Sequence, residues 1–175
     1  MYRTTKTDLP RMRNNQLFIA VIIIILLAGT YLYNKYRIAP DVKFDTLRIS
    51  DLQGRPVQIE TFRNRILFIN FFATWCGPCV SELPSLYSAS KKLEKNNFQF
   101  IYISDEPIER LTAFRNRLQL PIAIYHSETS LQQQNIYTIP TNYILNNNFE
   151  IVYKKVGLED WENPEVLEKL IALPL

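Results

Sequence analysis

An apolar run without a single charge occupies residues 17–33 and separates two parts of the chain with different chemistry. As an α-helix this run would span roughly 25 Å, near the lower limit for crossing a bilayer. A cleaved signal peptide is the alternative, but its apolar part usually covers about 7–15 residues and ends at small residues. Ala28-Gly29-Thr30 is a poor cleavage site, and the run continues into Tyr31-Leu32-Tyr33, which is typical of an interfacial aromatic belt. We therefore predict an uncleaved transmembrane anchor over 17–33.

Charge is distributed unevenly about this run. Residues 1–43 carry seven Lys/Arg and two Asp/Glu, whereas residues 44–175 carry thirteen and fifteen. Four basic residues precede the run and three follow it, a bias that favours the N-terminus inside. We expect a cytoplasmic tail (1–16), a linker (34–43) and a domain (44–175) facing the periplasm or cell exterior. The protein would cross the cytoplasmic or inner membrane once, and the domain has no basic stripe that would indicate nucleic-acid binding.

Predicted strands and helices alternate between residues 44 and 175. The continuous apolar run 66–72 is typical of a strand buried on both faces of a sheet. Further strands are predicted at 44–49, 56–59, 98–104, 122–125, 142–145 and 150–155, and helices at 76–95, 108–118 and 164–172. This order indicates an α/β fold, a mixed central sheet flanked by helices on both faces.

The only two cysteines, Cys76 and Cys79, stand two residues apart where the buried strand ends and a helix is predicted to begin. A cysteine at a helix N-terminus meets unpaired backbone N–H groups and the positive end of the helix dipole, which stabilise a thiolate. The spacing lets Cys79 resolve a mixed disulfide formed at Cys76. Pro78 suits the first helical turn because it lacks the N–H that would be unpaired there. Trp75 offers an apolar wall beside the sulfur.

Other uses of the cysteine pair fit the sequence less well. A structural zinc site needs four ligands, and besides the two cysteines the chain has one distant histidine, His126. Haem attachment would need a histidine at position 80, which is valine. We expect no metal and no bound cofactor other than a redox-active Cys76–Cys79 disulfide. We interpret His126 as a surface or hydrogen-bonded residue, Asp105-Glu106 as a helix-capping stretch and Trp161 as a packing residue.

Four segments of residues 44–175 resemble the membrane-anchored TlpA/ResA-like branch of the thioredoxin superfamily. They are Leu52-Gln-Gly-Arg-Pro-Val57, Ile69-Asn-Phe-Phe-Ala-Thr-Trp-Cys-Gly-Pro-Cys79, Glu82-Leu-Pro84 and Ile139-Pro140-Thr141. The resemblance implies a thioredoxin-like fold in which Cys76 attacks and Cys79 resolves. It also implies that Pro140 is cis and lies against the disulfide, where Ile139, Pro140 and Trp75 shape a substrate groove.

Two positions depart from better-known patterns. Thioredoxin has a buried aspartate six residues before its first cysteine, where this chain has Asn70, and an amide cannot take a proton from Cys79. In the ResA-like branch a glutamate three residues after the second cysteine is linked to thiol chemistry, and Glu82 occupies that place; a solvated helix residue is the alternative. Relatives often carry other pairs where this chain has Gly77-Pro78, so their redox potentials do not transfer.

We therefore expect a membrane-anchored, extracytoplasmic thiol–disulfide oxidoreductase that reduces protein disulfides. Its partners would be protein disulfide or dithiol substrates and a membrane thiol protein that recharges the pair; by resemblance, one setting is cytochrome c maturation. The alternatives are a copper chaperone of related fold and a redox-inert interaction domain. Copper chaperones tend to space their cysteines more widely and use a distal histidine, whereas an intact cysteine pair argues against an inert domain.

Overall fold

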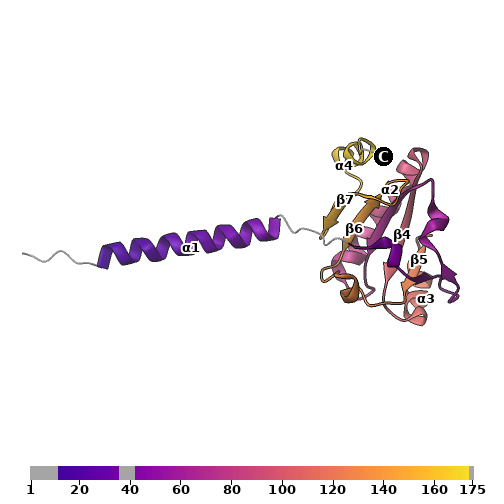
Figure 1. Cartoon of the computed structure of the whole chain (residues 1–175), viewed down its shortest axis with the longest axis horizontal. Coiled ribbons are helices and arrows are strands. Elements are labelled where there is room, and N and C mark those ends of the chain that lie inside the picture. The colour runs from indigo at the N-terminus through magenta and orange to yellow at the C-terminus, as the bar shows by residue number, and fades with distance from the viewer. Residues whose placement is uncertain (1–11, 36–41, 174–175) are drawn as a thin grey trace, which may run out of the picture. The chain divides into compact units, whose positions relative to one another are not determined.

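The computed structural model describes residues 12–35 and 42–173, which fall into two compact units, Met1–Arg37 and Ile38–Leu175 (Figure 1). The first unit contains helix α1 (Met12–Lys35), whose 24 residues span about 36 Å. Its stretch Gln16–Tyr33 has a mean hydropathy of 2.3, and none of its residues is buried. The length and apolar composition of α1 are sufficient for it to cross a membrane once. A signal sequence can have the same length and composition.

Two predicted segments lie largely outside the described residues. They are most of the tail 1–16 and most of the linker 34–43. The helix itself extends beyond the predicted run 17–33 at both ends. Within it, the Thr30 hydroxyl donates to the carbonyl oxygens of Leu26 and Leu27, each at 2.9 Å. The Thr30 hydroxyl is therefore paired with its own helix, which lowers the cost of placing it in an apolar environment.

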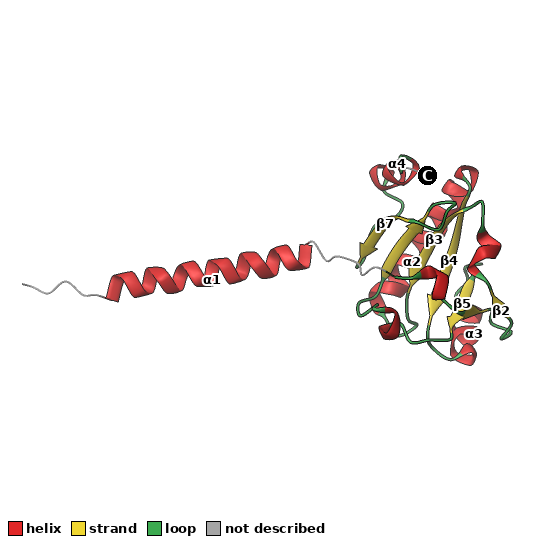
Figure 2. Cartoon of the chain, viewed as in Figure 1, coloured by secondary structure: helices red, strands yellow, loops and turns green. Residues whose placement is uncertain are grey.

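The second unit contains a seven-stranded sheet in the order β2-β1-β5-β4-β3-β6-β7 (Figure 2). The strands are β1 (Ile49–Ser50), β2 (Pro56–Val57), β3 (Ile66–Phe71), β4 (Phe98–Ser104), β5 (Ile124–Ser127), β6 (Thr141–Leu145) and β7 (Ile151–Val156). The α-helices are α2 (Gly77–Leu93), α3 (Ile108–Arg117) and α4 (Pro164–Ile171). Short 3-10 helices occur at Phe44–Thr46 (η1), Ile59–Phe62 (η2), Glu94–Asn96 (η3) and Gln132–Gln134 (η4). This mixed α/β sheet flanked by helices confirms the predicted fold class.

The centre of the sheet is parallel and its edges are antiparallel. β3 pairs in parallel with β4, and β4 with β5, whereas β6 runs antiparallel to β3, and β7 to β6. Every residue of β3 is buried, as its continuous apolar sequence predicts for a strand covered on both faces. Because β3 and β4 are parallel, the loops that follow both strands meet at the same edge of the sheet.

Two apolar clusters cover the faces of the sheet. The buried apolar residues of α2, α3 and α4 all belong to the first cluster, together with Phe68, Phe100 and Trp161. The second cluster is built from the alternate strand residues and from Phe44 of η1 and Ile59 of η2. Helices therefore cover both faces, as predicted, but only one face carries α-helices. The other face carries short 3-10 helices, because residues 44–62 are too rich in turns to form longer elements.

Candidate active site

The cysteine pair lies where β3 gives way to α2. Cys76 is the N-cap of α2, and its Sγ accepts a hydrogen bond from the Cys79 backbone N–H at 3.2 Å. The Cys76 N–H donates in turn to the Ala73 carbonyl oxygen at 3.1 Å, which closes the turn between strand and helix. Sulfur at this position faces the unpaired N–H groups of the first helical turn. The local fold therefore stabilises negative charge on Cys76.

Cys76 and Cys79 form a disulfide with Sγ atoms 2.08 Å apart and Cα atoms 5.2 Å apart. The two sulfurs differ in access. The Cys76 residue is 7% exposed, whereas Cys79 is fully buried among the apolar residues of the first cluster. Gly77 and Pro78 complete the first turn at the surface. An incoming thiol or disulfide can therefore reach Cys76 before it can reach Cys79.

The loop before β6 meets the disulfide from the other side. The Ile139–Pro140 peptide bond is cis, as the resemblance predicts. The Ile139 carbonyl oxygen lies 3.9 Å from Cys76 Sγ. The Pro140 carbonyl accepts a hydrogen bond from Gly157 N–H at 2.8 Å, which joins this loop to the segment after β7. The structure thus brings the predicted substrate residues Ile139 and Pro140 to the attacking sulfur.

Three exposed apolar side chains belong to the turn that holds Cys76, to the loop before β6 and to the segment after β7 that pairs with that loop. Trp75, Tyr137 and Leu158 are 72%, 76% and 57% exposed. Trp75 precedes Cys76, Tyr137 stands two residues before Ile139, and Leu158 follows Gly157. Within the described residues 42–173, the only other large apolar side chain so exposed is Ile171 of α4. We call Trp75, Tyr137 and Leu158 the apolar rim; exposed apolar side chains next in sequence to residues of a reactive site indicate a surface for another molecule.

Glu82 lies one helical turn beyond Cys79 on the same side of α2, and it is buried. Its Oε1 accepts a hydrogen bond from Asn70 Nδ2 at 2.9 Å, and its Oε2 accepts one from Trp161 Nε1 at 3.3 Å. Burial away from water raises the pKa of Glu82 to about 7, although these hydrogen bonds and one from the Glu159 backbone act to lower it. A carboxyl group with this pKa can accept or donate a proton at neutral pH.

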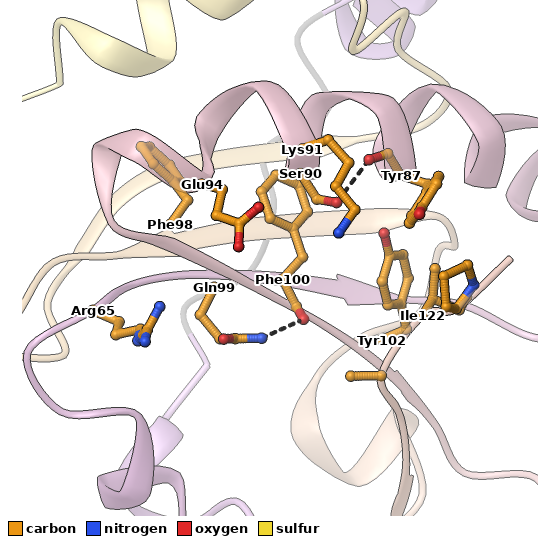
Figure 3. Close-up of a pocket in the computed structure, with 12 residues that line it drawn as sticks. Arg65, Tyr87, Ser90, Lys91, Glu94, Phe98, Gln99, Phe100, Tyr102 and Ile122 are labelled. Carbon is orange, nitrogen blue, oxygen red and sulfur yellow. Dashed lines mark hydrogen bonds between the residues drawn. The ribbon is translucent and has the colours of Figure 1, made fainter.

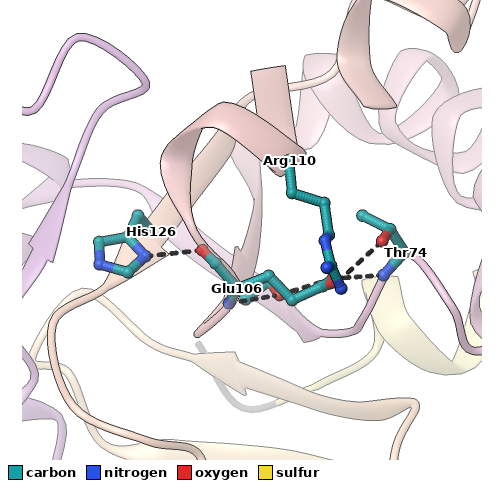
Figure 4. Close-up of polar contacts among 5 residues, drawn as sticks. Thr74, Glu106, Arg110 and His126 are labelled. Atoms are coloured by element: carbon teal, nitrogen blue, oxygen red, sulfur yellow. Dashed lines mark hydrogen bonds and ion pairs between the residues drawn. The ribbon is translucent and has the colours of Figure 1, made fainter. Parts of the chain in front are cut away.

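A second carboxylate holds the loop that precedes Cys76. Glu106 is buried just after β4, and its Oε2 and Oε1 accept hydrogen bonds from Thr74 N–H at 2.6 Å and Thr74 Oγ1 at 2.8 Å (Figure 4). Arg110 lies 3.4 Å from Oε1, and His126 Nδ1 lies 2.9 Å from the Glu106 carbonyl oxygen. The predicted hydrogen-bonded histidine is therefore confirmed. The prediction of a capping stretch is wrong, because α3 has Pro107 as its N-cap and Glu106 binds Thr74 instead.

A separate hollow lies along the second half of α2 (Figure 3). Tyr87 and Lys91 of α2 line it together with Gln99 and Tyr102 of β4. The Tyr102 hydroxyl is buried and has no hydrogen-bond partner among the described residues. None of the residues that line this hollow belongs to the disulfide motif or to the loop 137–140.

The described part of the chain contains no group of three or more His, Cys, Asp or Glu residues that could hold a metal ion. No observation therefore favours the copper-chaperone alternative. The predicted site residues Trp75, Cys76, Gly77, Pro78 and Cys79 occupy one strand-to-helix turn, with Glu82 one helical turn further on.

Sequence reasoning missed three residues of this region. Glu106 and Asn142 were not singled out for function, and Trp161 was assigned to packing alone. Trp161 is fully buried and packs edge-on against Phe68, so the packing prediction is confirmed, but its indole N–H also binds Glu82. The available signal was Asn142, a polar residue in a predicted strand that is otherwise apolar.

Comparison with known proteins agrees with this geometry. A family model described as "AhpC/TSA family" matches residues 37–154. The thiol-disulfide oxidoreductase ResA of Bacillus anthracis is 23% identical over 172 residues, covering 92% of this chain and 99% of that protein. ResA of Geobacillus thermodenitrificans is 26% identical over 141 residues, covering 75% and 81%.

Solved structures share the fold. StoA from Bacillus subtilis superposes with a TM-score of 0.56 at 21% identity, covering 76% of this chain and 96% of that one. A thiol:disulfide interchange protein of the thioredoxin family from Chlorobium tepidum gives a TM-score of 0.57 at 17% identity, covering 77% and 100%. At these identities the structures establish the thioredoxin-like fold of residues 42–173.

Proposed function

This chain belongs to the AhpC/TSA family and is a thiol–disulfide oxidoreductase, and we propose that its Cys76–Cys79 pair reduces disulfides of protein substrates outside the cytoplasm. The observation that carries the proposal is the disulfide itself, which lies at the N-terminus of α2 with Cys76 slightly exposed and Cys79 fully buried. This asymmetry suits a reaction in which one sulfur meets the substrate and the other completes the exchange.

The exchange takes two steps. In the reduced protein the Cys76 thiolate attacks a substrate disulfide, so that a Cys76–substrate bond forms and one substrate sulfur leaves as a thiolate. Glu82 then takes the proton from Cys79, and the Cys79 thiolate attacks Cys76 Sγ. The mixed disulfide breaks, the second substrate sulfur leaves as a thiolate, and both substrate thiolates take protons from solvent. Two electrons pass to the substrate, and the Cys76–Cys79 disulfide remains.

The surroundings of Cys76 favour a polypeptide as substrate. The apolar rim offers exposed apolar side chains on the turn of Cys76 and on the loops next to Ile139 and Gly157, and the Ile139 carbonyl lies next to the sulfur. A substrate strand could pair with the backbone at Ile139 while its own disulfide meets Cys76. Side chains of the substrate that flank its cysteine would then pack on Trp75, Tyr137 and Leu158. A small dithiol would use few of these contacts, so the rim serves a larger partner.

The remaining parts of the proposal concern the membrane. The apolar helix α1 supports a single-pass anchor, and the flanking charge supports a domain on the outer side. A reductase there needs a source of electrons, so we include a membrane thiol protein that re-reduces the Cys76–Cys79 pair. The resemblance to the TlpA/ResA-like branch supports apocytochrome c as one substrate.

Single-cysteine variants of the full-length protein test the proposal. With a dithiol present, the wild-type protein should reduce insulin disulfides, and both Cys76→Ser and Cys79→Ser should lose turnover. Cys79→Ser should accumulate a mixed disulfide through Cys76, which mass mapping would locate, because Cys79 is no longer there to break it. Equal or greater adduct on Cys79 in the Cys76→Ser variant would overturn the assigned order of attack.

A further inference from the structure

Three polar side chains form a row beneath Glu82. Tyr102, Asn70 and Asn142 are register partners on the adjacent strands β4, β3 and β6, so their side chains point to the same face of the sheet. This is the face that α2 covers, and all three residues are buried. Buried amides in the middle of an apolar sheet are costly unless they are paired, and a costly feature of this kind calls for a reason.

The two amides are only half paired. Asn70 Nδ2 donates to Glu82 Oε1 at 2.9 Å and to Asn142 Oδ1 at 2.7 Å. Asn70 Oδ1 and Asn142 Nδ2 have no hydrogen-bond partner among the described residues, although the Asn142 amide is near enough to Glu82 to lower its pKa. Asn70 therefore turns its donor and not its acceptor toward the carboxyl group. This arrangement suits an ionised Glu82, which can only accept hydrogen bonds.

We propose that the side-chain amides of Asn70 and Asn142 both rotate by a half-turn about their last side-chain bond when Glu82 gains or loses a proton. This rotation is reversible. This inference rests on the proposed proton transfer between Glu82 and Cys79 and deepens it. Asn70 and Asn142 act as positioning residues, since they touch the carboxyl group and not the substrate.

The turned arrangement uses the same atomic positions. The oxygen and nitrogen of an amide differ little in size, so a half-turn about the last side-chain bond leaves the packing unchanged. After both turns, Asn70 Oδ1 occupies the place of Nδ2 and accepts from the O–H of neutral Glu82. It also accepts from Asn142 Nδ2, which now faces it. Each arrangement makes two hydrogen bonds, so the protonation state of Glu82 selects between them.

The benefit lies in the exchange reaction. If the amides were fixed as donors, a proton arriving on Glu82 would face Asn70 N–H, and that oxygen would lose its partner in an apolar site. With turning amides the carboxyl oxygen facing Asn70 stays paired in both states. The cost of moving a proton between Cys79 and Glu82 then falls in both directions, as an enzyme that passes through both states requires.

The other titratable groups near Glu82 are few. Cys79 lies on α2 itself, and the Tyr102 hydroxyl faces from β4, where burial, and after it the charge of Glu82, raises the pKa of Tyr102. Lys155 of β7 is the register partner of Asn142, and its Nζ lies 2.6 Å from Glu159 Oε2. Lys155 and Glu159 neutralise each other, and β3 and β6 contribute only the amides. In the oxidised protein Cys79 does not titrate, so Glu82 is the group that the amides would follow near neutral pH.

Nuclear magnetic resonance of the oxidised, ¹³C,¹⁵N-labelled full-length protein in detergent micelles tests the inference. The side-chain NH₂ signals of Asn70 and Asn142 are assigned by their loss in Asn70→Leu and Asn142→Leu. Between pH 5 and pH 9 both signals should change with one midpoint, equal to that of the Glu82 carboxyl carbon. In Glu82→Gln both changes should disappear. Asn146 is the internal control, because its Oδ1 is held by the N–H groups of Asn148 and Glu150.

Two results would overturn the inference: a Glu82 carbon that titrates while both amides stay fixed, or a change confined to Asn70. Insulin reduction is measured separately on the wild-type protein. Fixed amides in a protein that reduces insulin would remove this inference alone. Amides that rotate in a protein that does not reduce insulin would contradict the proposed function and would still support the inference about Asn70 and Asn142.

Discussion

At the scale of single residues, the buried carboxyl of Glu82 links the stability of the domain to pH. Its pKa rises from 4.5 to about 7 on folding, so between these values the folded state holds a proton that the unfolded state has lost. The free energy of unfolding therefore falls as pH rises through this window. One pKa unit corresponds to about 1.4 kcal/mol, so the loss between pH 5 and pH 8 amounts to about 2 to 3 kcal/mol.

Glu82→Gln should remove both the pH-dependent loss of stability and the proton acceptor. In denaturant unfolding of the oxidised full-length protein, the variant should gain about 2 to 3 kcal/mol relative to the wild type between pH 5 and pH 8. Its insulin reduction at pH 7 should fall on the order of 100-fold, and the rise of wild-type rate as Glu82 ionises near pH 7 should be missing.

Glu162→Gln is the matched control for this prediction. Glu162 is exposed, and its carboxyl approaches only Lys92, at 3.9 Å, among the described residues. An exposed pair of this kind contributes little, so both the pH profile and the stability should match the wild type. An unchanged pH profile in Glu82→Gln would show that Cys79 loses its proton by another route.

At the scale of elements, the turn between β3 and α2 is fixed from the end of β4. Glu106 accepts both the backbone N–H and the hydroxyl of Thr74, two residues before Cys76. Glu106→Gln replaces one accepting oxygen with an NH₂ group, so one of these two hydrogen bonds is lost. We expect insulin reduction to fall about tenfold because Trp75 and Cys76 lose their fixed position relative to Ile139.

Arg110→Ala provides the comparison for Glu106→Gln. The Arg110 side chain is 60% exposed and meets Glu106 at 3.4 Å, so its loss should cost under about 1 kcal/mol and leave insulin reduction near the wild-type rate. Alkylation of reduced Cys76 by a small reagent should change less than insulin reduction in Glu106→Gln, since a small reagent does not depend on the apolar rim. Equal losses in both assays would refute a positioning role.

The elements that sequence predicted well are those with a strong apolar pattern. The strands at 66–72 and 98–104 are β3 and β4 to within one residue, and the helix at 76–95 is α2 with Cys76 as its cap. The strand predicted at 44–49 is wrong over most of its length, because Phe44–Thr46 is a 3-10 helix and only Ile49–Ser50 pairs. There, alternating apolar residues pack on the sheet from a turn, and periodicity does not distinguish the two cases.

The residues of the candidate site also fall into those that the sequence predicted and those that it did not. The motif residues from Trp75 to Cys79 are adjacent in sequence, so local pattern was enough to find them. Glu106 and Asn142 reach the site through the pairing of β3 with β4 and β6. That register depends on contacts between distant segments, which no single stretch of sequence encodes. Resemblance supplied Pro140, whose place at Cys76 is also a long-range contact.

At the scale of the whole molecule, the chain joins an apolar helix to an acidic domain. Every residue of the stretch Gln16–Tyr33 is exposed, and its side chains find no cover in the described structure. Exposing such an apolar surface to water is unfavourable, whereas the hydrocarbon core of a bilayer, about 30 Å thick, solvates it. The domain places its apolar residues in two internal clusters and needs no lipid to fold over them.

We therefore predict that the full-length protein stays in the membrane fraction after alkaline carbonate extraction and that a variant lacking residues 1–33 is released. The physical reason is the transfer of the uncharged stretch 17–33 from water into lipid, which the solvation of a domain with a net charge of −2 cannot offset. A mature N-terminus near residue 30, found by sequencing the purified protein, would establish a cleaved signal instead. As the control, Lys169→Ala alters an exposed residue of α4 and should leave the fractionation unchanged.

The orientation of the domain is a separate prediction. A protease added to intact spheroplasts should digest the domain if the N-terminus lies inside, and protection of the domain until lysis would reverse the predicted orientation.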